Sequence, residues 1–133
     1  MQEVSDAELL EVIKDFLEMG HVENIAAMFY REPRYFDWTG DVLDDERFNV
    51  RLGVSVLFEE LQARQCSQLH LAVPSLTKLL TSDQPLLRGE ALSVLAIIGI
   101  PGLGGQAGQM LADENPQVRE IAADIIASLK PDC

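Results

Sequence analysis

Apolar residues recur every three or four positions along most of the chain, a pattern that predicts amphipathic helices. The first helix is expected to open at Ser5 and Glu8, which form a capping box, and to end at Gly20. Its apolar face carries Leu9, Val12, Ile13, Phe16 and Leu17, and its polar face carries Glu11, Lys14, Asp15 and Glu18. A second helix is predicted over residues 22–31, because the ring of Pro33 removes a backbone donor beyond it.

The same periodicity continues to the end of the chain. It predicts a helix over 35–43, shortened or kinked by Gly40, and a long helix over 47–64 whose buried face holds Val50, Val54, Leu57, Phe58 and Leu61. Further helices are predicted over 70–80, 85–98, 101–112 and 116–129, with Lys130-Pro131 as the final stop. No segment alternates with period two for long, so we expect no sheet.

One pattern occurs three times in these helices. Each copy has paired apolar residues, a turn acid, an apolar residue followed by arginine, and then a small or apolar residue. The arginines Arg51, Arg88 and Arg119 mark the copies, and they stand 37 and 31 residues apart. A period of 20 to 50 residues is typical of stacked repeat proteins.

The segments PSLTKLLTSDQPLLRGEALSVLAIIG and QMLADENPQVREIAADIIASL resemble HEAT repeats, and more narrowly the short bacterial and archaeal HEAT-like type related to that of phycobilisome lyases. The resemblance covers about residues 35–130. It implies an all-α fold, a right-handed alpha-alpha superhelix of about three helix pairs. The first copy departs from the family pattern, with Phe48 in place of proline and Val54 in place of alanine.

On this basis we expect a single domain over residues 1–133. Its parts would be a helical cap over 1–34 and repeats over 35–65, 69–99 and 101–130. The sequence leaves open whether the cap is itself a degenerate repeat.

The turn acids and the arginines are interpreted as a structural ladder that links the repeats. Each acid can cap the helix that follows, and each arginine can reach an acid of its own or a neighbouring turn. The ladder residues are Asp45, Arg51, Asp83, Arg88, Asp113 and Arg119. The alternative is an anion site lined by the three arginines. The apolar residues beside them favour the ladder.

The net charge of −12 makes nucleic-acid and anionic-membrane partners unfavourable. Residues 1–65 carry 6 basic and 15 acidic side chains. This asymmetry indicates either a solubilising surface or a basic protein partner. Two isolated cysteines, Cys66 and Cys133, favour a reducing compartment. With no signal-peptide pattern and no long apolar segment, we expect a cytoplasmic protein.

Five of the eight aromatic residues fall within positions 29–38. One interpretation is a hydrophobic plug that closes one end of the stack. The other is a partner pocket that uses Tyr35 and Trp38, since these residue types are enriched at binding hot spots.

No catalytic or metal-binding constellation emerges. His21 and His70 are far apart in the chain, and His21 with Glu23 is a poor metal signal. The glycine-rich segment 99–108 follows a helix rather than a strand, which favours close packing over phosphate binding. Cys66 near His70 is only a weak indication of thiolate chemistry. We therefore expect no enzyme activity and no cofactor.

The favoured function is a protein–protein interaction scaffold or adaptor. The second helices of a solenoid line one continuous surface. Here that surface is expected to use Asn49, Leu52, Ser55, Glu59, Gln62, Gly89, Ser93, Glu120 and Asp124. The alternative is a lyase-like or chaperone-like accessory protein for tetrapyrrole attachment, which needs a concave cavity near Cys66. DNA binding is a third hypothesis, and it needs a basic groove.

The last helix is expected to leave an apolar strip uncovered. This strip would contain Val118, Ile121, Ala122, Ile125, Ile126 and Leu129. An exposed apolar strip on an acidic molecule is typical of an association site. We therefore expect a symmetric homodimer through this helix, or the docking of a partner helix on Ile121 and its neighbours.

Overall fold

The structure is a computed structural model that describes residues 4–129, and these residues form only helices, turns and loops. The prediction of an all-helical chain is confirmed. In chain order the elements are α1 (Asp6–Glu18), α2 (Val22–Arg31), the 3-10 helix η1 (Pro33–Trp38), α3 (Thr39–Leu43), α4 (Phe48–Ala63), the 3-10 helix η2 (Leu69–Ala72), α5 (Val73–Leu79), α6 (Pro85–Ile98), α7 (Leu103–Met110) and α8 (Pro116–Ser128).

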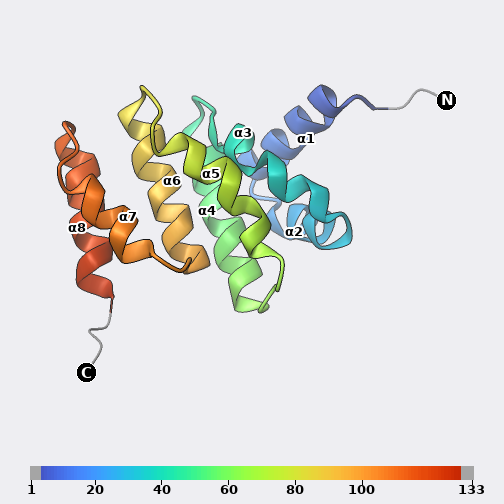
Figure 1. The fold of residues 1–133 in the computed structure, drawn as a ribbon. Helices are drawn as coiled ribbons and strands as arrows, with labels where there is room; N and C mark the ends of the chain where they lie inside the picture. Colours follow the sequence, from blue (N-terminus) through green and yellow to red (C-terminus); the bar gives the residue numbers. More distant parts are fainter. Residues whose placement is uncertain (1–3, 130–133) are drawn as a thin grey trace.

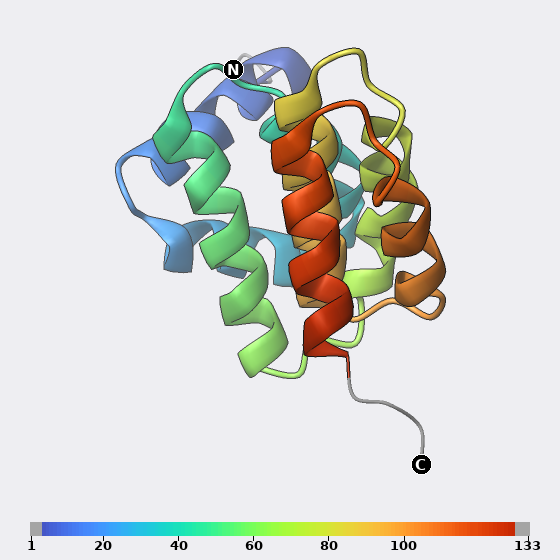
Figure 2. The ribbon, with the colours of Figure 1, turned by 90° about the vertical axis from the view of Figure 1, so that its left-hand side faces the viewer.

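The helices form a row that runs from α1 and α2 at one end to α7 and α8 at the other (Figure 1). Within this row α6 packs against both α4 and α8, while α1 and α2 cover the other side of α4. A second set of shorter elements flanks the row, where η1 packs on η2, α3 on α5, and α7 on α8. Figure 2 shows α4 and α8 side-on, with α7 beside α8.

The ends of the first two helices agree with the sequence signals. The side chain of Ser5 accepts a hydrogen bond of 3.1 Å from the backbone amide of Glu8. Gly20 then turns the chain with φ +84°, a conformation that glycine adopts without strain. The second helix ends at Arg31, just before Pro33.

The core lies between the row and the flanking elements. The predicted inward face of α4 is fully buried, and so are Ala91, Val94 and Leu95 at the equivalent positions of α6. The largest buried side chains come from the helices α1 to α6 and include Phe29, Phe36, Phe58, Ile13, Ile25, Leu43, Leu57, Leu61, Leu76, Leu92 and Leu95.

Two helices differ from the prediction. The segments predicted as single helices over 35–43 and 70–80 are each a 3-10 helix followed by a short α-helix. In the second, Pro74 lacks an amide donor and occupies the first turn of α5, where that donor is not needed. In the first, the buried hydroxyl of Thr39 donates to the carbonyl oxygen of Phe36, 2.8 Å away, at the junction. These two 3-10 helices, η1 and η2, pack against each other.

Gly40 has a different role from the predicted kink. A Cβ atom at this position would lie 2.7 Å from the carbonyl oxygen of Ser75. The amide of Gly40 also donates to the hydroxyl of Ser75 at 3.1 Å. Gly40 therefore allows α3 and α5 to approach closely.

The stop signal predicted at Lys130-Pro131 lies outside the described residues, as does Cys133. α8 ends at Ser128, within one residue of the expected boundary.

The close approach of α3 and α5 predicts opposite effects for two glycine substitutions. Gly40→Ala should destabilise the fold by about 1–3 kcal/mol, because the backbone of Ser75 must move to admit a methyl group. Gly105→Ala in α7 should stabilise it by about 0.5–1 kcal/mol, since that position is open and helical. Urea unfolding of the two variants measures both values. Equal effects would contradict the proposed packing role of Gly40.

Candidate functional site

An apolar stripe runs along the outer face of α4. Phe48, Leu52 and Val56 stand four residues apart, so they share one side of the helix. Their exposed fractions are 62%, 47% and 40%. Isolated exposed apolar residues are ordinary, but three in line on one helix are typical of a contact surface.

A shallow groove lies beside this α4 stripe. Its floor is formed where α4 meets the corner between α1 and α2, and its volume is about 230 Å³. Gly53 makes this contact close, because a Cβ atom there would lie 2.8 Å from the Cβ of Leu17. Asn49, Leu52 and Val56 line the α4 side of the groove.

The polar residues predicted for the same surface are exposed on α4 and α8. Asn49, Glu59, Glu120 and Asp124 are all exposed. Gly89 is buried, because the side chain of Ile121 lies against it, and Ser93 is half-buried. The apolar part of the surface is therefore concentrated on α4, and α8 contributes acidic groups.

The buried arginine of α6 links two neighbouring turns. The Nε and Nη2 atoms of Arg88 donate to Oδ2 and Oδ1 of Asp113 at 2.9 and 2.8 Å, so the pair is bidentate. Its Nη1 donates to the carbonyl oxygen of Ser82, 2.8 Å away in its own turn. The side chain of Arg88 lowers the pKa of Asp113 below its usual value, and a backbone bond from Asn115 adds to the effect.

Each of the three arginines binds the carbonyl oxygen six residues before it. Arg51 donates to Asp45, Arg88 to Ser82, and Arg119 to Asp113. Among the described residues, Arg119 has no carboxylate partner within 4 Å.

The prediction that Asp83 is the second turn acid is wrong by one residue. The side chains of Asp45, Ser82 and Asp113 each accept a bond from the amide two positions on, so these three residues are equivalent. Asp83 is exposed, and within residues 4–129 it forms no ion pair. The middle turn therefore carries a serine where the other two carry an acid.

Lys14 supplies the ladder contact that precedes the first turn. Predicted on the polar face of α1, it is buried, and its Nζ lies 3.3 Å from Oδ2 of Asp45. Lys14 thus pairs with Asp45 as Arg88 pairs with Asp113. The sequence contains a signal for this, because Ile13, Lys14 and Leu17 repeat the spacing of apolar, basic and apolar residues found in the later copies.

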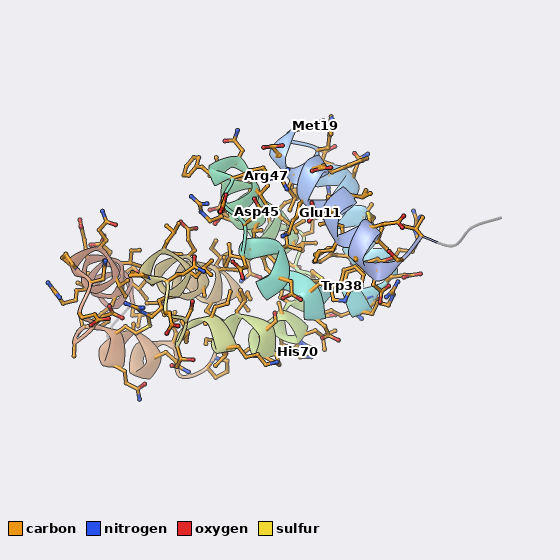
Figure 3. The ribbon with its side chains drawn as sticks, turned by 90° about the horizontal axis from the view of Figure 1, so that it is seen from above. Glu11, Met19, Trp38, Asp45, Arg47 and His70 are labelled. Atoms are coloured by element: carbon orange, nitrogen blue, oxygen red, sulfur yellow. The ribbon has the colours of Figure 1, made fainter. Side chains whose placement is uncertain are left out.

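Arg47 fixes α1 to the start of α4 (Figure 3). Its guanidinium lies 3.0 Å from Asp45, 2.8 Å from Asp15, 3.2 Å from Glu18 and 3.8 Å from Glu11. Hydrogen bonds from the Arg47 side chain hold the pKa of Asp45 well below its usual range. No sequence pattern singles out Arg47, since its partners Asp15 and Glu18 on α1 lie 32 and 29 residues away.

The aromatic residues pack mainly on one another. Tyr35 is buried, and its ring lies 5.0 Å from that of Trp38 and 6.0 Å from that of Phe29. Trp38 is half-buried, and the guanidinium of Arg34 lies over it, 5.2 Å from the ring centre. This packing supports the plug interpretation more than a pocket that uses Tyr35 and Trp38.

Residues that carry reactive groups are dispersed. His70 Nδ1 lies 3.2 Å from the carbonyl oxygen of Ser67, while Cys66 is buried in the core. Across residues 4–129, no three His, Cys, Asp or Glu side chains are grouped to hold a metal ion. A hollow of about 590 Å³ is lined mainly by α5 and by the loop between α6 and α7, and Cys66 does not line it.

The strip predicted on α8 is mostly covered. Val118 and Ala122 are buried, and Ile121, Ile125 and Ile126 are half-buried, which leaves Leu129 as the exposed member. The apolar arc is wide because it faces both α6 and α7. The homodimer predicted through α8 therefore loses most of the apolar surface that suggested it.

None of the helices in the described part of the chain is both long enough and apolar enough to cross a membrane. Comparisons of the chain with models of protein families, with curated proteins and with solved structures gave no match.

The ladder predicts a pH-dependent effect for Arg88. Arg88→Ala should lower the melting temperature by several degrees at neutral pH, because Asp113 then lacks its bidentate partner. The folded pKa of Asp113 is depressed, so its contribution is present above about 3.8 and is lost as pH falls through the folded value. The difference between the variant and the wild type should therefore shrink in acid. Calorimetry at neutral and acidic pH measures it, and a difference that grows in acid would contradict the ladder.

Proposed function

We propose that this chain is a HEAT-like helical-repeat protein that serves as a non-enzymatic interaction scaffold. The observation that carries the proposal is the exposed stripe of Phe48, Leu52 and Val56 on α4. Such a stripe costs solubility unless a partner covers it, and it lies at the centre of the row rather than at a terminus.

The repeat interpretation is supported by recurring contacts. The bond from each arginine to the carbonyl oxygen six residues earlier occurs at the start of α4, α6 and α8. The ion pairs of Lys14 with Asp45 and of Arg88 with Asp113 repeat the same arrangement: a basic side chain on one helix of the row binds the acid in the turn before the next helix of the row. We infer a right-handed superhelix in which α1 belongs to a degenerate leading repeat and α4, α6 and α8 are the second helices of three pairs.

The chemistry around the α4 stripe indicates the kind of partner. Glu59 follows Val56 on the same helix and is exposed, and Glu18 borders the groove. With a net charge of −12, the protein should attract a segment that carries apolar residues flanked by basic ones. The cytoplasmic location stays a prediction from cysteine usage.

A matched pair of surface substitutions tests this function. Leu52 and Leu111 have similar exposed fractions, 47% and 45%, but Leu111 lies at the α7–α8 turn. We expect Leu52→Glu to abolish capture of a specific protein from the native host, because a charge interrupts the stripe. We expect Leu111→Glu to leave capture unchanged.

The measurement is affinity capture with mass spectrometry, followed by calorimetric titration of the purified partner. Loss of at least tenfold in affinity for Leu52→Glu alone is the expected result. Equal capture by wild type and both variants would refute binding through α4.

A further inference from the structure

The ladder has one gap, at Arg51. This side chain is 8% exposed, as is Arg88. Nη1 of Arg51 donates to the carbonyl oxygens of Asp45 and Glu46, both at 2.8 Å. Its Nε is buried and has no hydrogen-bond partner.

The gap has a chemical cause in the next turn. In the following layer, the Nε and Nη2 edge of Arg88 binds the two carboxylate oxygens of Asp113. Ser82 holds the position in the turn before α6 that Asp113 holds in the turn before α8, and its hydroxyl already accepts a bond from the amide of Gln84. A serine hydroxyl cannot accept two parallel bonds from a guanidinium, so this edge of Arg51 remains without an acceptor.

A cleft of about 380 Å³ lies at this gap, between the turns that precede α4 and α6. Arg51 lines it together with Gln84, Leu86 and Leu87 on one side and residues 44–46 on the other. Leu86 is half exposed, and Phe48, whose ring lies 5.8 Å from the guanidinium of Arg51, begins the α4 stripe. The cleft thus combines a buried guanidinium whose Nε has no acceptor with apolar surface.

We propose that this cleft is a subsite for a carboxylate carried by the bound partner segment. The carboxylate accepts two bonds, from Nε and Nη2 of Arg51, and an apolar group next to it packs on Leu86. The inference rests on the proposed scaffold function, and it adds a specificity element: a C-terminal carboxylate on an apolar residue of the partner segment.

The charges around the cleft make it selective. Asp45 is neutralised by Lys14 and Arg47, at 3.3 and 3.0 Å. Asp44 and Glu46 are exposed and form no ion pair among the described residues, so they repel free anions. Burial raises the pKa of Glu90 on α6, and the positive charge of Arg51 partly opposes that rise. A carboxylate must therefore arrive attached to a group that gains contact with Leu86, and simple anions should bind poorly.

Small probes test the subsite without knowledge of the partner. The probe is 4-methylpentanoate, which joins a carboxylate to an isobutyl group. Its neutral isostere 4-methylpentanamide and acetate serve as controls. The readout is the NMR signal of the Arg51 Nε–H group and of the backbone amides of residues 82–87, recorded on the full chain.

We expect 4-methylpentanoate to shift these signals in a saturable way with a dissociation constant in the millimolar range, and the two controls to do so at least tenfold more weakly. Ser82→Asp should abolish the response, because the new carboxylate fills the edge of Arg51. Arg51→Lys, which keeps the charge but lacks Nε, should abolish the response of the backbone amides.

Absence of a saturable shift, an equal response to the amide, or an unchanged response in Ser82→Asp would overturn the subsite. These failures are separable from failure of the scaffold function. If the probe does not bind while Leu52→Glu still loses the partner, the subsite is wrong and the scaffold function stands. If the probe binds while capture does not depend on Leu52, the carboxylate subsite stands and binding through α4 is wrong.

Discussion

The bond between an arginine in the first turn of a helix and the carbonyl oxygen six residues earlier is the interaction on which this structure depends. A helix start leaves amides unpaired, and the turn before it leaves carbonyl oxygens that need donors. Arg51, Arg88 and Arg119 supply those donors in the same way at three turns. Where the turn also carries an acid, a basic side chain from the previous helix of the row (α1 or α6) binds it, so the same turn joins two layers.

This arrangement determines where the surface is left apolar. The charged side chains of the ladder lie at the starts of α4, α6 and α8, and the inward faces of these helices pack in the core. The outer face of α4 is left to Phe48, Leu52 and Val56, beside the corner where α1 meets α2. The ladder gap at Arg51 adjoins this face, so a layer contact without an ion pair and the proposed binding surface meet at the start of α4.

The sequence predicted the helices better than the contacts between them. Capping residues and prolines located α1, α2 and α6 closely, because these signals act within a few positions. The 3-10 segments were missed, since over four to six residues the apolar period does not separate them from α-helix. In the first and third copies the turn acid stands six residues before the arginine, and this spacing selects Ser82 rather than Asp83 in the second copy. Only the structure shows why: the arginine side chain donates a hydrogen bond to the backbone carbonyl of that residue. The coverage of α8 depends on two distant helices, which no local pattern records.

The coupling between positions 51 and 82 tests the ladder most directly. Thermal unfolding should be measured for Ser82→Asp, Arg51→Met and the double variant. Ser82→Asp should raise the melting temperature while Arg51 is present, because the carboxylate completes the pair seen between Arg88 and Asp113. It should give no such gain in the Arg51→Met background. A melting temperature that is unchanged or lowered by Ser82→Asp, or raised equally in both backgrounds, would contradict the account.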